Sequence, residues 1–201
     1  VSNGIDLSKY KKDPKKEEVF RKHFNIQEGE KVVLCAGLYF RRKGIEDFVE
    51  VARRMPDVRF IWLGSINKWL IPRAIRRLVE KDHPSNVEFP GYFKGAVFQG
   101  AMTGADAFFF PSYEETEGIV VLEALAGHQH VVLRDIPVYH GWVDQESAEL
   151  CHSVDEFVDS LEKVLSGQVD KRDAGDRVAQ SRSIDLVADQ LVKAYQQVLE
   201  M

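Results

Sequence analysis

The sequence predicts an α/β fold: a Rossmann-like, doubly wound, mostly parallel sheet with helices on both faces. One observation is a series of short apolar runs, which are typical of buried parallel strands. Another is the helical periodicity between these runs, which indicates βαβ units. With 201 residues and 44% hydrophobic composition, the chain can bury one sizeable core, so we expect one domain spanning 1–201. The expected strands are residues 32–37, 58–64, 87–89, 107–110, 131–133 and, more weakly, 148–151.

Helical periodicity is clearest in three places. It follows the first expected strand, recurs near residue 160 and returns at 183–201, which we expect to be a C-terminal helix. The segment 166–182 is rich in charge, glycine and serine, so it is expected to be the most loop-like region. The apolar positions that mark these helices are Ile45, Phe48, Val49 and Ala52, then Phe157, Val158, Leu161, Val164 and Leu165, then Leu186, Val187, Leu191, Ala194, Tyr195 and Val198.

Composition excludes several classes of protein. The sequence has no apolar run of the roughly 18 residues that a membrane span needs, and no signal peptide precedes the first expected strand. Its two cysteines, Cys35 and Cys151, fall in expected strands and show neither a disulfide pattern nor metal-ligand spacing. A soluble, cytoplasmic protein is therefore expected.

The most informative stretch is PSYEETEGIVVLEALA, residues 111–126. It follows the apolar run 107–110, and it continues after Gly118 as a buried helix. This arrangement places Glu115 in a loop at the carboxyl end of a strand and Glu123 one to two turns inside the helix. That edge of an open α/β sheet is where ligands bind.

Each part of this stretch has a chemical use. The amides around Gly118, Ile119 and Val120 lack acceptors within the helix, so together with the helix dipole they suit an anion such as a diphosphate. Glu115 and Glu123 offer only acceptors, which suit the hydroxyls of a hexose and a ribose. The alternative is that glutamates near a helix start merely pair with its dipole, which is worth about 0.3–1 kcal/mol.

The whole string resembles the signature of the family-4 retaining glycosyltransferases of GT-B fold, P-S-x-x-E-G-F-G-L-x-x-L-E-A-M-A. The resemblance implies a UDP-sugar donor, most simply UDP-glucose, and transfer of a hexose without a metal ion or other cofactor. Glu115 would then hold the sugar and stabilise the transition state, and Glu123 would hold the ribose. The matching residues are Pro111, Ser112, Glu115, Gly118, Leu122, Glu123, Ala124 and Ala126.

A second loop, residues 37–44, resembles the family's G-R-L-x-x-x-K-G segment. The match implies that Lys43 is a catalytic cation at the donor diphosphate and that Gly37 lies beside the donor. Leu38 replaces the family arginine, so that contact is lost or is supplied by Arg41 or Arg42. We favour Arg42, because Arg41 fits a solvated basic turn.

Other rim positions complete the expected binding site. Ser65 follows the second expected strand and Glu117 precedes Gly118 in the donor loop, so both are expected to contact substrate. Tyr92 and Phe93 follow the third strand, where the family places the nucleotide base, although an aromatic residue there is more often part of the core. His128 and His130 replace the family's glycine and proline; without a third ligand they are interpreted as surface or loop residues.

The beginning of the chain, Val-Ser-Asn-Gly-Ile-Asp, resembles the segment that leads into the C-terminal domain of these enzymes, so 1–8 is interpreted as a linker. An acceptor-binding N-terminal domain would then be absent. The string 112–125 and the run 132–139 look closest to diacylglycerol glucosyltransferases of Gram-positive bacteria. Two other classes stay open, a GT-B-like sugar-nucleotide epimerase and a non-catalytic module that binds a sugar nucleotide.

Charge is distributed unevenly along the chain. Residues 1–100 contain 20 lysines and arginines against 13 acidic residues, and the remainder contains 7 against 19. One face could therefore meet an anionic membrane surface, and residues 67–79 mix basic side chains with Trp69, Leu70 and Ile71 as interfacial helices do. An ordinary sheet-covering helix is the alternative. No nucleic-acid-binding motif accompanies these cations.

Overall fold

The computed structural model describes residues 3–200, and its sheet has six parallel strands in the order β3-β2-β1-β4-β5-β6. All five strand pairings are parallel, which confirms the expected α/β fold. The strands are β1 (Val32–Ala36), β2 (Arg59–Leu63), β3 (Val87–Gly91), β4 (Ala107–Phe110), β5 (Val131–Arg134) and β6 (Glu149–Cys151).

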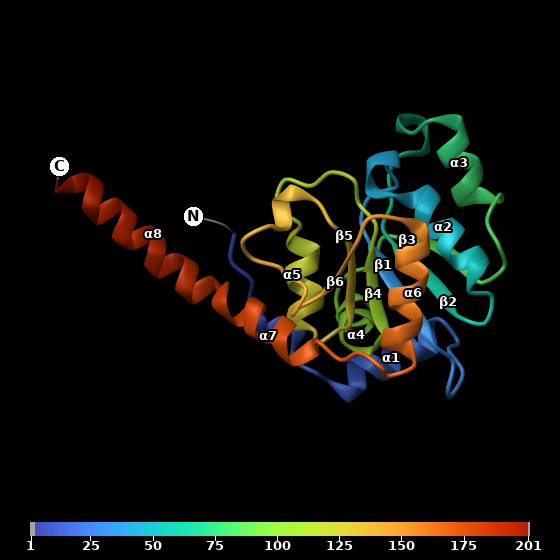
Figure 1. The fold of residues 1–201 in the computed structure, drawn as a ribbon, viewed down its shortest axis with the longest axis horizontal. Helices are drawn as coiled ribbons and strands as arrows, with labels where there is room; N and C mark the ends of the chain where they lie inside the picture. The colour runs from blue at the N-terminus through green and yellow to red at the C-terminus, as the bar shows by residue number, and fades with distance from the viewer. Residues whose placement is uncertain (1–2, 201) are drawn as a thin grey trace.

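Helices cover both faces of the sheet (Figure 1). The first, fourth, fifth and seventh helices pack together in one layer, and the second, third and sixth form the other. The helices are α1 (Pro14–His23), α2 (Ile45–Arg54), α3 (Arg73–Glu80), α4 (Ala96–Gly104), α5 (Ile119–Ala126), α6 (Val154–Leu165), α7 (Arg172–Ser181) and α8 (Ile184–Leu199).

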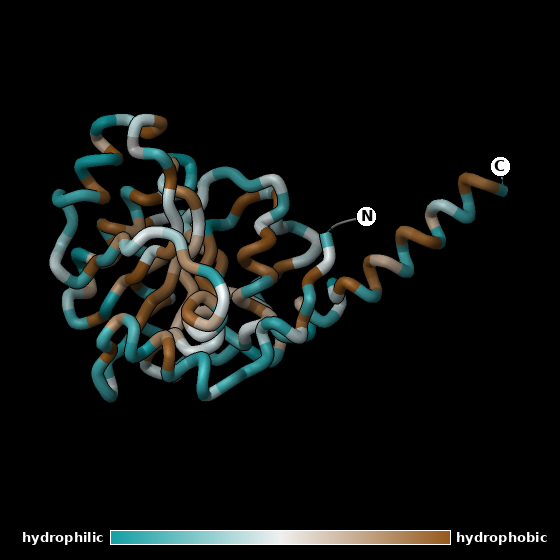
Figure 2. Tube along the Cα trace, turned by 180° about the vertical axis from the view of Figure 1, so that it is seen from behind, coloured by the Kyte–Doolittle hydropathy of each residue, from teal (hydrophilic) through white to brown (hydrophobic). Residues whose placement is uncertain are grey.

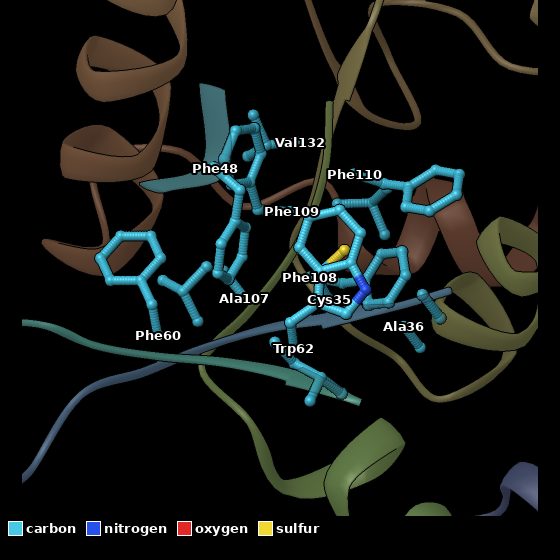
Figure 3. Packing of buried hydrophobic residues seen from close by; sticks show 14 of the residues in the cluster. Cys35, Ala36, Phe48, Phe60, Trp62, Ala107, Phe108, Phe109, Phe110 and Val132 are labelled. Atoms are coloured by element: carbon cyan, nitrogen blue, oxygen red, sulfur yellow. The ribbon is translucent and has the colours of Figure 1, made fainter. Parts of the chain in front are cut away.

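The core lies along the central strands, which are buried on both sides because helices cover both faces. Every residue of β1, β4 and β5 is buried. Figure 3 shows aromatic rings from neighbouring elements meeting there, and the rings of Phe48 and Phe109 stack with centroids 5.8 Å apart. The apolar colour in Figure 2 is accordingly concentrated in the middle of the fold.

One expectation from the sequence was wrong. The segment 166–182 is not mainly loop, since α7 occupies Arg172–Ser181. This helix buries only the small residues Gly175 and Ala179, and a Cβ added at Gly175 would lie 2.7 Å from Leu125 Cδ2 on α5. A helix that docks through small residues has no large apolar stripe, so periodicity could not reveal it.

The last helix leaves the body of the fold. Figure 1 shows α8 projecting outward from its first turn, with the N-terminal segment beside its base. The two segments are joined by backbone bonds from Ile5 N to Arg182 O (3.0 Å) and from Ile184 N to Ile5 O (2.9 Å). Residues 1–2 of the expected linker and residue 201 of the expected C-terminal helix lie outside the described residues.

The sheet order creates a crevice between β1 and β4. These strands are neighbours, but the chain leaves β1 toward β2 and leaves β4 toward β5, on the other side. Their following loops therefore diverge at the carboxyl edge, and a crevice of this kind is the usual ligand site of open α/β sheets. The two loops singled out from the sequence, 37–44 and 111–118, both lie at this point.

Candidate active site

The loop after β4 ends at Gly118, which is the N-cap of α5. Gly118 has a φ of 78°, a left-handed conformation that glycine adopts at little cost. The amide of Val121 bonds to Gly118 O at 2.8 Å, so the helix starts directly after this residue. The first amides of α5 therefore face the crevice, as an anion site at a helix N-terminus requires.

A cavity of about 520 Å³ occupies the crevice. Its wall brings together residues from the ends of β1, β2, β3 and β4, together with Asn3 from the N-terminal segment. The residues expected from the sequence that line it are Gly37, Arg42, Lys43, Ser65, Tyr92, Phe93, Glu115, Glu117, Gly118, Ile119 and Val120.

Lys43 and Glu115 form an ion pair at the floor of the cavity. Lys43 Nζ lies 2.5 Å from Glu115 Oε1, and their side chains are only 12% and 8% exposed. The Lys43 ammonium also lies 5.4 Å from the centroid of the Phe110 ring. A cation and a carboxylate side by side in low-dielectric surroundings can bind a ligand that carries both a negative group and hydroxyl donors.

The neighbouring arginines have different surroundings. The Arg42 guanidinium donates a hydrogen bond to Glu114 O at 3.0 Å, which holds the two loops together. Arg41 pairs with Glu46 at 2.8 Å, is largely exposed, and does not line the cavity. Leu38, at the position of the family arginine, lines the cavity and is partly exposed. Of the two arginines, Arg42 is the one beside the crevice.

Glu123 does not line this cavity. Its carboxylate accepts a hydrogen bond from the Tyr10 hydroxyl at 2.5 Å. Burial raises the pKa of Glu123, and the bond from Tyr10 opposes part of that rise. The bond from Tyr10 engages only one oxygen of the carboxylate, and the assignment of Glu123 as a ribose ligand stays a prediction.

Glu117 is held by both ends of the domain. Its Oε1 accepts a hydrogen bond from the Asn3 amide at 2.8 Å, and its other oxygen accepts one from the Asn3 side chain. Arg182, just before α8, lies 3.5 Å from the same Oε1. Asn3 and Arg182 were not singled out from the sequence, because nothing local marks a contact between residues so far apart in the chain.

The rim on the β2 and β3 side contains a very close backbone approach. A Cβ added at Gly64 would lie 1.8 Å from Gly37 O, so only glycine fits between the two strand ends. Tyr92 is 71% exposed on this rim, which leaves its ring face open to a planar ligand. Phe93 is half-buried and packs edge-on against Phe24, with centroids 5.6 Å apart.

The two unusual histidines lie away from the cavity. His128 has a φ of 58° and pairs with Asp173 at 3.7 Å, whereas His130 lies 4.0 Å from Asp170. Burial lowers the pKa of His130. Within residues 3–200, no three side chains of the metal-binding types come together to form a metal site. In the same range, no helix is both long and apolar enough to cross a membrane.

Known proteins resemble this chain in sequence and in fold. The processive diacylglycerol alpha-glucosyltransferase of Acholeplasma laidlawii is 48% identical over 203 residues, covering 100% of this chain and 61% of that protein. Sucrose-phosphate synthase of Thermosynechococcus elongatus has a similar fold, with a TM-score of 0.86 at 21% identity, covering 100% of this chain and 52% of that one. HepE of Anabaena, solved with UDP-glucose, has a TM-score of 0.83 at 16% identity, covering 98% and 57%.

The family comparison agrees with this similarity. Residues 16–181 match the model of the family described as "Glycosyl transferases group 1". The matched region includes both loops of the crevice and the whole sheet. The chain therefore belongs to the group 1 glycosyl transferases.

Proposed function

We propose that this chain binds a UDP-sugar, UDP-glucose in the first instance, as the donor domain of a retaining glycosyltransferase. The enzyme would transfer the hexose to an acceptor hydroxyl, with diacylglycerol or a glycolipid as the acceptor class. The relative from Acholeplasma, a diacylglycerol alpha-glucosyltransferase by name, supports the acceptor, and the UDP-glucose bound to HepE supports the donor.

The observation that carries the proposal is the Lys43–Glu115 pair beside the start of α5. A diphosphate at the helix N-terminus would attract the Lys43 ammonium, which can stabilise charge on the departing UDP. Glu115 would then be freed to accept hydrogen bonds from the sugar and to stabilise positive charge at the reacting carbon. One ion pair thus supplies both groups that the transfer needs.

Tyr92 and Arg42 would serve the rest of the donor. The exposed ring of Tyr92 can stack on the base, and Arg42, which lines the cavity, would bind the phosphates. The proposal includes no metal ion, because Lys43 and the helix amides supply the positive charge. Undiminished transfer in the presence of EDTA is the expected result.

The proposal also includes a second, acceptor-binding domain. The chain spans 61% of the length of the Acholeplasma relative. The helix α8 projects from the body with exposed apolar side chains, among them Val192, Tyr195 and Val198. Such a face gains stability when it is covered. We infer that α8 packs against the acceptor-binding domain, so that this chain alone binds the donor but transfers sugar poorly.

Calorimetry with UDP, UDP-glucose and NAD tests the donor assignment. We expect UDP and UDP-glucose to bind this chain and NAD not to bind. The absence of heat at millimolar UDP would overturn the proposal, and equal binding of NAD would indicate a different dinucleotide-binding function. Labelled sugar transfer by the two-domain enzyme separates the transferase from an epimerase, which would alter the donor itself, and from a non-catalytic binding module.

An anionic membrane surface is the further partner that we propose. Trp69 is 74% exposed and Leu70 is 69% exposed, just before α3. Arg73 is exposed beside them, and the Arg76 guanidinium lies 5.5 Å from the Trp69 ring centroid. Exposed apolar side chains beside cations are typical of helices that enter a lipid interface.

Vesicle sedimentation tests this surface. We expect binding to vesicles that contain phosphatidylglycerol and weak binding to pure phosphatidylcholine. The double variant Trp69→Ala, Leu70→Ala should lose binding, while Val19→Ala, an exposed apolar position on α1, should keep it. Equal binding by both variants would contradict the assignment of this surface without affecting the donor site.

A further inference from the structure

Arg134 is a buried cation that the donor site does not use directly. It ends β5, its side chain is only 10% exposed, and it does not line the cavity. Its Nε donates to Pro111 O at 3.1 Å, and its Nη1 donates to His152 O at 3.2 Å. The guanidinium therefore ties β5 to the first residue of the loop that carries Glu115.

The same guanidinium also contacts Tyr113 and Asp47. Its central carbon lies 3.9 Å from the centroid of the Tyr113 ring, and its Nη2 pairs with Asp47 Oδ2. The Tyr113 hydroxyl donates to the same Asp47 oxygen at 2.6 Å. Because Asp47 lies in the first turn of α2, these three side chains connect α2, β5 and the donor loop.

The other side of the donor loop is fixed by the turn that carries Lys43. Tyr113 N donates to Arg42 O at 2.8 Å, and Ser112 Oγ donates to the same carbonyl at 3.2 Å. Residues 111–114 are thus held between Arg134 on one side and the 41–43 turn on the other. The next residue in the loop is Glu115, which meets Lys43 at 2.5 Å.

Burying an arginine at this position has a high desolvation cost. Removing a charge from water costs several kcal/mol even when it is paired, and an apolar residue would be the cheaper choice at a buried strand end. The planar guanidinium, however, can meet two carbonyls, a carboxylate and a ring face at once, which no apolar side chain can do. Two of these contacts, to Pro111 O and to the Tyr113 ring, fix the donor loop directly, while those to His152 O and Asp47 anchor the guanidinium to the rest of the fold.

We propose that Arg134, with Asp47 and Tyr113, is a positioning residue that sets Glu115 against Lys43 and holds the donor loop ready for the sugar end of the donor. The inference rests on the proposed function only in giving Glu115 a role at the sugar. The order of the loop itself does not depend on any ligand.

Arg134→Lys is the main test, because it keeps the charge and removes the planar fork. Arg59→Lys is its matched control: Arg59 is also largely buried, pairs with Glu88 and Glu30 and donates to Phe24 O, but it lies at the amino end of β2, away from the cavity. We expect native-state exchange of the Tyr113 amide, which donates to Arg42 O, to lose protection in Arg134→Lys only. Unchanged protection there, in a variant that is folded by circular dichroism, overturns the proposal whether or not any donor binds.

Function supplies the second readout. In the two-domain enzyme, Arg134→Lys should lower kcat by about 10²-fold, the effect of misplacing a reacting group by roughly 1 Å. Its KM for the donor and the affinity of the chain for UDP should stay near wild type, since the proposed function gives Glu115 a role at the sugar and not at UDP. Tyr113→Phe, which keeps the ring under the guanidinium, should show a smaller loss of kcat.

Equal losses of kcat in Arg134→Lys and Arg59→Lys would reduce Arg134 to a general contributor to stability and overturn the proposal. If the wild type binds no UDP-sugar, the proposed function fails, and the exchange measurement still decides the role of Arg134 in ordering the loop.

Discussion

Tyr10 donates a hydrogen bond to Glu123 at 2.5 Å, joining a turn near the start of the chain to the helix that begins at the donor cavity. Both groups are partly buried. Burial and the neighbouring carboxylate raise the pKa of Tyr10, so its hydroxyl stays protonated and remains a donor. One oxygen of the residue that the family resemblance assigns to the ribose thus already accepts a hydrogen bond within the chain.

The raised pKa of Glu123 predicts a particular pH dependence of stability. A carboxyl whose folded pKa is raised contributes stability that is complete below its ordinary pKa of about 4.3 and is lost as pH rises through the raised value. Glu123→Gln has no ionisable carboxyl at this position, so its stability does not fall with rising pH for this reason. The melting temperature of Glu123→Gln relative to wild type should therefore rise as pH increases above the ordinary pKa of a glutamate.

Glu18→Gln is a control of opposite sign. Lys22 lowers the pKa of Glu18, so the stability that Glu18 contributes is present above its ordinary pKa and lost as pH falls. The melting temperature of Glu18→Gln relative to wild type should therefore fall as pH rises. The fall should be slight, because the pair is exposed. Parallel pH trends in the two variants would contradict the assignment for Glu123.

The sequence predicted much of the fold, because the strands are short apolar runs and most of the helices between them leave a periodic pattern. The helix α7, which buries only two small residues, is the exception. It also predicted the two loops of the crevice, since β1 and β4 must place their carboxyl ends together in such a sheet. The partners of Glu117 and Glu123 were not predictable, because Asn3 and Tyr10 are more than 100 residues away in sequence. Arg134 escaped notice because a cation at the end of an apolar strand usually faces water.

Gly118 should be intolerant of a side chain. Its φ of 78° is strained for other residues, and an added Cβ would lie 2.8 Å from Tyr139 Cε1 in the core. Gly29 has a similar φ of 79° but open space around it. We expect Gly118→Ala to lower stability by about 1–3 kcal/mol and to abolish UDP binding, while Gly29→Ala shows only the backbone strain and binds normally. Chemical denaturation and calorimetry on both variants measure the difference.

Both cysteines should be inert in the folded chain. Cys35 and Cys151 are free and buried. Burial raises the pKa of Cys35 well above its ordinary value and that of Cys151 to about 11, so little reactive thiolate exists near neutral pH. A thiol-reactive chromogenic disulfide should modify neither residue until denaturant is added. Rapid modification of the native chain would show that one of these strands opens readily.

The Lys43–Glu115 pair should be costly to break by removing only one partner. Both side chains are nearly buried, so removing one partner leaves an uncompensated charge, which costs about 3–5 kcal/mol in comparable pairs. Lys43→Met and Glu115→Gln should each destabilise the chain, and the double variant should recover much of the loss. Additive losses in the double variant would mean that the two residues act independently.

Glu115 should also be separable from Glu114, its neighbour in the loop. Glu115 faces Lys43 in the cavity, whereas Glu114 is exposed and lies outside both the cavity wall and the family signature. A carboxylate that stabilises developing positive charge matters more in the transition state than in the ground state. Glu115→Gln in the two-domain enzyme should therefore lower kcat by about 10²-fold, as for loss of one electrostatic stabiliser, with little change in UDP affinity. Glu114→Gln should leave turnover near normal. If the two variants lose activity equally, or if Glu115→Gln turns over normally, the carboxylate that acts at the sugar is a different residue.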